Sequence, residues 1–168
     1  MIVIVMGVTG SGKSTIGKLL ADRLGISFYD ADDFHSAANR AKMAKNVPLD
    51  DADRWPWLEL LAKHSVEWEA QGGAVLACSA VKQAYRDLLL AHVPNHHIVY
   101  LELSRDGAAR RLEARRGHHE FVRDFDHILD GQFRDLEPPM DANTISAELS
   151  PPEIVERAAA ALSTVSHH

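Results

Sequence analysis

A glycine-rich segment near the N-terminus has the residue types and spacing that bind phosphate. Residues 7–14 read Gly-Val-Thr-Gly-Ser-Gly-Lys-Ser, the complete G-x-x-x-x-G-K-[ST] pattern of a P-loop. Its glycines let the backbone turn without a Cβ in the way, so successive N–H groups can point at phosphate oxygens. Lys13 can reach the β- and γ-phosphates of a nucleotide, and Ser14 can ligate Mg²⁺. The residues expected to contact ATP here are Gly7, Thr9, Gly10, Ser11, Gly12, Lys13, Ser14 and Thr15.

A second polar cluster, Asp30-Ala31-Asp32-Asp33, follows a short run of apolar and aromatic residues at 26–29. Three carboxylates in four positions repel one another, and a positive partner such as Mg²⁺ relieves that cost. A carboxylate in this place can also accept the proton of an attacking alcohol. We therefore expect functional roles for Asp30 and Asp32. Asp33 is more simply interpreted as the N-cap of the next helix.

Two cationic side chains occur in a segment that follows a third apolar run, 74–78. Lys82 and Arg86 are four residues apart, so they would share one face near the start of a helix over 81–92. Two cations on one face suit an anionic group of a substrate. A solvated helix face explains the pair equally well. Cys78, at the end of the apolar run, is interpreted as a small buried hydrophobic residue and not as a nucleophile.

The polar segment 35–58 lies between these clusters and contains both charged and aromatic residues. It either covers a substrate or forms a pair of surface helices. If it covers a substrate, His35, Arg40 and Arg54 are the side chains that we expect to contact it. Trp57 in the same segment is most simply a core residue.

Five arginines fall within residues 105–116, and Gly117 follows them directly. Such a segment predicts a mobile basic lid, over about residues 115–126, that closes over a triphosphate and stabilises the transferring phosphoryl group. Arg111 and Arg115 are then expected to contact the nucleotide, with Arg116 in a catalytic role. The alternative is a solvated helix face, which suits some of the five arginines.

Alternating strand and helix patterns must position these side chains. Strands are expected at 2–6, 26–29, 74–78, 97–103 and 144–147, and helices at 13–24, 34–45, 53–70, 81–92, 106–116, 126–136 and 152–162. This alternation predicts an α/β fold in which a five-stranded parallel sheet is flanked by helices. Ligands bind such sheets beyond the carboxyl ends of the strands, which is where the polar clusters fall.

Composition narrows the remaining classes of function. The chain has 168 residues, which suits a single domain over 1–168, and a net charge of −6 with no long basic run. That charge argues against nucleic acid as the main partner. No apolar stretch approaches the ~20 residues of a membrane span, and Met1 leads straight into the first expected strand, so we expect no membrane contact and no signal peptide. A single cysteine favours a reducing, cytoplasmic location.

Several of these motifs occur together in one family. The P-loop is followed by Asp30-Ala-Asp-Asp-Phe-His35, Asn39-x-x-Lys42-Met43, Pro48-Leu49-x-Asp51-x-Asp53-Arg54-x-Pro56-Trp57-Leu58, Cys78-Ser79-Ala80-x-Lys82-x-x-Tyr85-Arg86-Asp87, Arg115-Arg116-Gly117-His118, Gln132-Phe133 and Leu136-Glu137-Pro138. In this order and combination the motifs resemble the small gluconokinases, and the resemblance covers most of residues 1–140.

The resemblance implies a P-loop kinase fold and phosphorylation of D-gluconate at its 6-hydroxyl, with ATP and Mg²⁺. It implies that Asp32 faces the acceptor alcohol and that Asp30, with Ser14, lies nearer the metal. Members of the family are usually cytosolic and often dimeric, so a homodimer is possible. The gluconate carboxylate needs a cationic patch distant from Asp32, for which Lys82 and Arg86 are the first candidates and Arg40 and Arg54 the next.

Two other functions compete with this hypothesis. Another small-metabolite kinase, such as a shikimate kinase, would also use the acidic pair and the cations, but Cys78-Ser79-Ala80 stands where shikimate kinases have a glycine cluster. A nucleotide-binding regulatory module would use the P-loop alone. The acidic cluster argues against such a module, because a nucleotide sensor needs no base to activate an alcohol.

Overall fold

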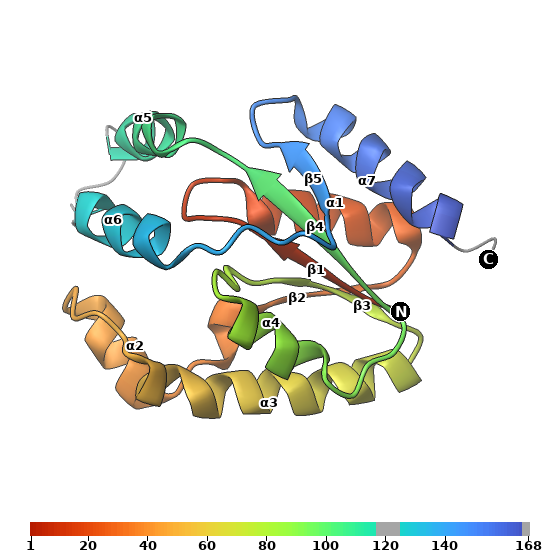
Figure 1. Cartoon of the computed structure of the whole chain (residues 1–168), viewed down its shortest axis with the longest axis horizontal. Helices are drawn as coiled ribbons and strands as arrows, with labels where there is room; N and C mark the ends of the chain where they lie inside the picture. Colours follow the sequence, from red (N-terminus) through yellow and green to blue (C-terminus); the bar gives the residue numbers. More distant parts are fainter. Residues whose placement is uncertain (117–124, 166–168) are drawn as a thin grey trace.

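The sheet has five strands, all parallel, and it confirms the expected fold class (Figure 1). The computed structural model describes residues 1–116 and 125–165; at 115–116, 125–126 and 164–165 only the backbone is described. The strands are β1 (Ile2–Met6), β2 (Ser27–Asp30), β3 (Ala74–Ala77), β4 (His96–Glu102) and β5 (Asn143–Ser146), in the spatial order β2-β3-β1-β4-β5. β1 is therefore central: Ile4 pairs with Leu76 of β3 on one side and with Ile98 of β4 on the other.

Helices cover both faces of the sheet. They are α1 (Lys13–Leu24), α2 (Ala37–Ala44), α3 (Asp51–Ala70), α4 (Gln83–Leu90), α5 (Arg105–Arg116), α6 (Phe125–Asp135) and α7 (Pro151–Val165). In Figure 1, α1 and α7 lie together on one face and α3 and α4 on the other, while α2, α5 and α6 extend beyond the carboxyl ends of the strands. The described part of the chain has no helix with the length and apolar character needed to cross a membrane.

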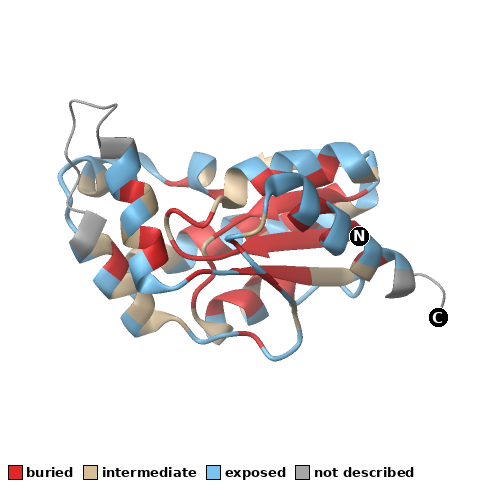
Figure 2. Cartoon of the chain, turned by 90° about the horizontal axis from the view of Figure 1, so that it is seen from above, coloured by how far each residue is buried: buried red, intermediate tan, exposed pale blue. Residues whose placement is uncertain are grey.

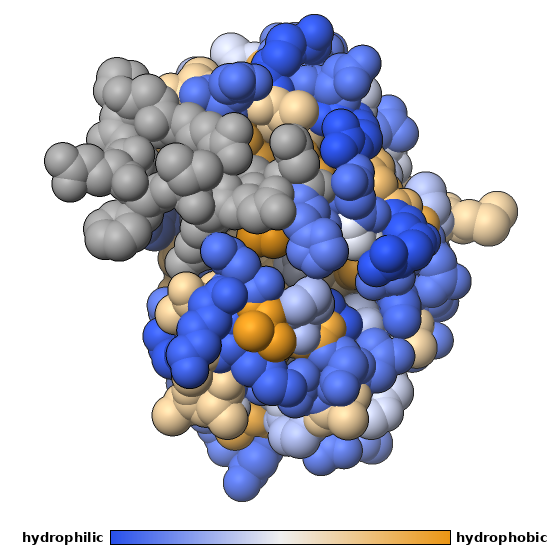
Figure 3. Space-filling view, turned by 90° about the vertical axis from the view of Figure 1, so that its left-hand side faces the viewer, coloured by the Kyte–Doolittle hydropathy of each residue, from blue (hydrophilic) through white to orange (hydrophobic). Residues whose placement is uncertain are grey.

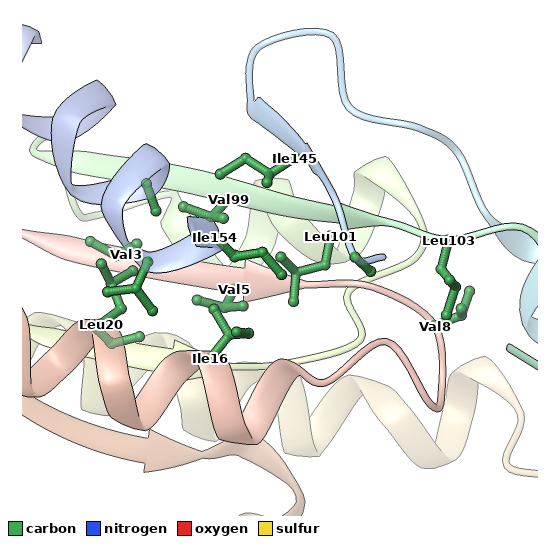
Figure 4. Close-up of a cluster of buried hydrophobic side chains, with 14 of the residues drawn as sticks. Val3, Val5, Val8, Ile16, Leu20, Val99, Leu101, Leu103, Ile145 and Ile154 are labelled. Atoms are coloured by element: carbon green, nitrogen blue, oxygen red, sulfur yellow. The ribbon is translucent and has the colours of Figure 1, made fainter. Parts of the chain in front are cut away.

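The core is divided in two by the sheet, because alternate residues of β1 point to opposite faces. Val3 and Val5 pack with Ile16 and Leu20 of α1 and with Ile154 of α7 (Figure 4). On the other face, Ile2, Ile4 and Met6 pack with residues of α3 and α4 that include Leu58, Leu61 and Leu89. Every residue of β1 is buried, as Figure 2 shows for the middle of the sheet, which explains its uninterrupted apolar sequence.

Three helix starts differ from the sequence predictions by two residues or more. The expected helix over 34–45 is a 3₁₀ turn, η1 (Ala31–Phe34), followed by the shorter α2. The prediction that Asp33 caps a helix is wrong: Asp30 caps η1, and Ser36 caps α2 through the N–H of Asn39. Short polar side chains compete for such positions, and the chain has several of them in a row.

The other two starts concern α3 and α4. α3 begins at Asp51, because Asp50 and Asp53 form a reciprocal capping box around its first turn. α4 begins at Gln83, so Lys82 is the N-cap residue and stands in extended conformation. Lys82 and Arg86 therefore do not share a helix face as their spacing predicts.

Candidate active site

The P-loop joins β1 to α1 and has a backbone that requires glycine. Gly10 and Gly12 have φ values of 89° and 92°, which are left-handed conformations that other residues adopt at a cost. At Gly7 a Cβ would lie 2.5 Å from Ser11 Oγ and 3.0 Å from the Leu101 carbonyl. The loop thus depends on all three glycines for its shape, and it opens at the carboxyl end of the central strand, where α/β proteins bind ligands.

Two cationic side chains lie against the P-loop. Lys13 Nζ donates to the Val8 carbonyl at 3.3 Å, so the side chain curls back over the loop. Arg111 of α5 donates to the carbonyls of Gly10 and Ser11 at 3.2 and 3.3 Å, and also to the Ala147 carbonyl beyond β5. Arg111, which we expected at the nucleotide, thereby braces the loop against α5 and the segment after β5.

Ser14 and Asp30 come together from different elements, as a shared metal site requires. Ser14 Oγ, at the start of α1, donates to Asp30 Oδ2 at 2.7 Å, at the end of β2. Within the described residues no group of three or more His, Cys, Asp or Glu side chains is placed to hold a metal ion. Mg²⁺ in kinases is bound through one or two carboxylates together with phosphates and water. The pair therefore fits Mg²⁺ that arrives with a nucleotide.

Asp32 lies beside this pair and keeps its carboxylate accessible. The side chain is 72% exposed, and its backbone N–H donates to Asp30 Oδ1 at 3.0 Å. Partial desolvation of the carboxylate by the surrounding protein raises the pKa of Asp32, and the Asp30 carboxylate adds to this rise, whereas Lys13 and His35 oppose it. An accessible carboxylate with a raised pKa, close to the P-loop, is suited to accept a proton from a bound alcohol.

His35 packs next to Asp32 in a defined tautomer. Its ring is buried, with 8% exposed, and stacks on Trp57 at a centroid distance of 4.1 Å. Asn39 Nδ2 donates to the Asp53 carbonyl at 3.0 Å, which identifies this atom as the amide nitrogen, and it also contacts His35 Nδ1 at 3.3 Å. Nδ1 therefore accepts, and the ring hydrogen is on Nε2, which lies 3.9 Å from Asp32 Oδ1. Burial lowers the pKa of His35 and favours this neutral form.

Three of the cations expected to contact a substrate are Arg40, Arg54 and Lys82, and they differ in what they bind. Arg40 stabilises the chain turn before α2: its guanidinium donates to the carbonyls of Asp33 at 2.7 Å and His35 at 3.2 Å. Arg54 and Lys82 instead both lie against the Tyr85 ring, 5.9 and 5.6 Å from its centroid. These two cations, brought together from α3 and the start of α4, are the pair that the structure offers to an anionic group.

The same two cations already pair with a carboxylate of the protein itself, Asp51. Its oxygens lie 3.6 Å from Arg54 and 3.3 Å from Lys82, and Oδ1 accepts a 2.5 Å hydrogen bond from the Tyr85 hydroxyl. The Tyr85 hydrogen bond, followed by Lys82 and Arg54, lowers the pKa of Asp51. An acid substrate would therefore meet cations that already have a partner.

Arg86, our first candidate for the substrate carboxylate, is directed into the protein. The residue is 1% exposed, and its guanidinium donates to the carbonyls of Ala80, Val81 and Glu137 and to Gln83 Oε1. Because α4 starts at Gln83, Arg86 lies in its first turn and reaches back to the carbonyls before the helix. This placement corrects the interpretation of Arg86 as an accessible partner of Lys82.

The expected lid falls largely outside the described residues. Residues 117–124 are not described, and of Arg115 and Arg116 only the helical backbone is, at the end of α5. Arg115 is one turn beyond Arg111 in that helix. The roles assigned to Arg115 and Arg116 stay predictions.

One contact of the P-loop was missed by the sequence analysis. The Thr9 N–H donates to the side-chain oxygen Oε1 of Gln132, in α6, at 2.6 Å. The two residues are 123 positions apart. Gln132 belongs to one of the motifs quoted above, but nothing in its local pattern assigned it a role.

These groups lie at one end of the molecule, seen face-on in Figure 3, where hydrophilic side chains dominate the surface around the undescribed segment. The P-loop, the Ser14–Asp30 pair and the accessible carboxylate of Asp32 define the class of protein: a P-loop kinase for a small molecule. The shikimate kinase family model matches residues 9–138.

The comparisons then specify the family. "Probable gluconokinase" of Mus musculus is 44% identical over 174 residues, which cover 91% of this chain and 92% of the mouse protein. "Thermosensitive gluconokinase" of Escherichia coli is 40% identical, over 81% of this chain and 71% of that protein. The crystal structure of a gluconokinase from Sinorhizobium meliloti superposes with a TM-score of 0.85 at 34% identity, over 97% of this chain and 91% of that chain. The chain belongs to the gluconokinase family of P-loop kinases.

Proposed function

We propose that the protein transfers the γ-phosphoryl group of ATP to the 6-hydroxyl of D-gluconate, giving 6-phospho-D-gluconate and ADP. The observation that carries this proposal is the pairing of an accessible carboxylate beside the P-loop with a separate cation pair, in a member of the gluconokinase family. Asp32 is 72% exposed at the P-loop end, and Arg54 and Lys82 lie around Tyr85. A sugar acid has a reacting hydroxyl and a carboxylate at opposite ends, and so needs both groups.

On the nucleotide side, the P-loop amides and Lys13 bind the phosphates. Ser14 and Asp30 would hold Mg²⁺, which neutralises charge on the β- and γ-phosphates when it is bound. Lys13 stabilises the charge that moves toward the β–γ bridging oxygen as that P–O bond breaks. Arg115 and Arg116 are proposed to approach the phosphates from the end of α5.

On the acceptor side, Asp32 takes the proton of the 6-hydroxyl while the hydroxyl oxygen forms a bond to the γ-phosphorus. The neutral His35, with its hydrogen on Nε2 toward Asp32, orients this carboxylate or the sugar hydroxyl next to it. The gluconate carboxylate lies on Arg54 and Lys82. Arg54 is the stronger partner, because a guanidinium can bind a carboxylate through two parallel hydrogen bonds.

A coupled kinase assay with gluconate, shikimate and glucose tests the proposal. We expect ADP formation that depends on gluconate, with the product phosphorylated at carbon 6 as read by phosphorus-coupled NMR. Faster turnover of shikimate than of gluconate would assign the site to the competing acid. ATP hydrolysis unaffected by any of the acids would favour the regulatory module. A cytoplasmic location and a homodimer stay predictions from the family resemblance.

A further inference from the structure

The contact between Gln132 and Thr9 connects the P-loop to a helix that no nucleotide-binding motif includes. The main-chain N–H groups of a P-loop are the groups that bind phosphate, so the orientation of each peptide in the loop affects binding. Thr9 comes before the residues that form the start of α1, which are the N-cap Gly12 and the first helical residues Lys13 and Ser14. The 2.6 Å hydrogen bond from Thr9 N–H to Gln132 Oε1 supplies an external partner for this peptide.

Gln132 is itself held in place by α6. Leu129, one turn earlier, is fully buried in the core cluster of β1, α1 and α7, and Phe133 packs against the same cluster. Asp130 of α6 pairs with Arg105 at the start of α5, with Nε to Oδ1 at 2.8 Å. The helix is thus a fixed support, and the position of the Gln132 carboxamide follows from it.

The C-terminal end of α6 is tied to the acceptor side of the site. The Glu137 N–H donates to the Val81 carbonyl at 2.8 Å, and the buried Arg86 guanidinium donates to the Glu137 carbonyl at 2.7 Å. Val81 directly precedes Lys82, one of the two cations proposed to bind the acid. A continuous set of contacts therefore runs from Thr9 through Gln132 and α6 to the segment that carries Lys82.

We propose that Gln132 is a positioning residue for phosphoryl transfer. It fixes the orientation of the Thr9 peptide in the P-loop before the γ-phosphate binds, and through α6 it keeps the loop in a fixed position relative to the acceptor side. The carboxamide suits this task because it is uncharged: its oxygen holds the Thr9 amide without placing a negative charge next to the phosphates. The inference deepens the proposed function, since the reaction that it serves is the transfer proposed above.

The test uses Gln132→Met, which keeps the length of the side chain and removes the hydrogen-bond acceptor. Arg134→Gln is the matched control, because Arg134 is on the same helix with its side chain 77% exposed. The first measurement is residue-resolved hydrogen exchange of the Thr9 amide without nucleotide. We expect exchange to become about tenfold faster in Gln132→Met, as expected for loss of one hydrogen bond, and to stay unchanged in Arg134→Gln. Equal exchange in Gln132→Met and wild type would overturn the proposal.

The second measurement separates positioning from a merely structural role. In Gln132→Met we expect the Kd of a non-hydrolysable ATP analogue to rise about tenfold and that of ADP to rise less, because an unfixed loop must be ordered at binding. With gluconate we expect a kcat lower by about 10-fold or more and an unchanged KM. Faster exchange with unchanged analogue affinity would overturn the proposal. If wild type fails to use gluconate, the proposed function fails, while the exchange and analogue arms still decide the role of Gln132.

Discussion

The P-loop takes its binding groups from one stretch of backbone, whereas the acceptor side that we propose takes them from side chains of several elements. Gly7, Gly10 and Gly12 shape the loop through local conformation and close packing. Asp32, Arg54 and Lys82 come from η1, α3 and the start of α4, and Arg54 and Lys82 already share the internal carboxylate Asp51. A backbone site is complete before the ligand arrives. A side-chain site of this kind must exchange an internal partner for the substrate.

This difference predicts that single side-chain changes act on different steps in the two halves. On the nucleotide side, Lys13→Ala should lower kcat by about 10³-fold, because the charge that it stabilises develops in the transition state. The Lys13 side chain contributes one hydrogen bond to the loop backbone, to the Val8 carbonyl at 3.3 Å, so circular dichroism and the melting temperature should stay close to wild type. Near-normal turnover in the coupled assay would contradict the assignment of Lys13.

On the acceptor side, Asp32→Asn keeps the shape of the side chain and removes its ability to take a proton. We expect kcat to fall by about 10²-fold or more. Isothermal titration should show that the affinity for a non-hydrolysable ATP analogue changes little. A collapse of nucleotide affinity with retained gluconate affinity would mean that Asp32 serves the metal and Asp30 the alcohol.

Arg86 tests whether a residue can stabilise the acceptor side without contacting the substrate, because it is buried and donates to the carbonyls that precede α4. Arg86→Met removes the guanidinium donor to the carbonyls of Ala80 and Glu137 and one of the two donors to the Val81 carbonyl, which keeps the Glu137 N–H. A buried carbonyl left without a donor costs about 1–3 kcal/mol, so the loss of these hydrogen bonds should lower the melting temperature by roughly 10 °C. The ratio of gluconate to glucose turnover in the folded fraction should stay near that of wild type. A lower ratio with an unchanged melting temperature would return Arg86 to the substrate site.

Alkylation should have almost no effect on Cys78, the residue directly after β3. The residue is 2% exposed, and burial raises the pKa of its thiol to about 12. At pH 8 the thiolate is therefore scarce and shielded, and iodoacetamide should leave the native protein unmodified by intact mass. The same reagent in urea should add one label. Rapid labelling of the native protein would show that this part of the site opens.

The sequence predicts what is local and misses what depends on distant contacts. The P-loop, its strand and its helix follow from adjacent residues, and the five-stranded parallel sheet follows from the alternation of patterns. The inward direction of Arg86 depends on a helix that starts two residues later than its apolar pattern indicates. The Gln132 contact spans 123 positions, and the shared partner of Arg54 and Lys82 comes from packing of α3 against α4. No periodicity in the sequence encodes such pairs.

We propose that the acceptor side recognises the acid through Arg54 and Lys82. The most direct test is kcat/KM for gluconate and for glucose in wild type and in Arg54→Gln. Glucose lacks the carboxylate, so Arg54 and Lys82 keep Asp51 as their partner and the sugar gains no charge-assisted hydrogen bond, which is worth about 1.5–3 kcal/mol. We predict that wild type prefers gluconate by about 10²-fold or more, and that Arg54→Gln reduces this ratio by about tenfold through weaker use of gluconate alone. Equal use of the two sugars by wild type would contradict the claim.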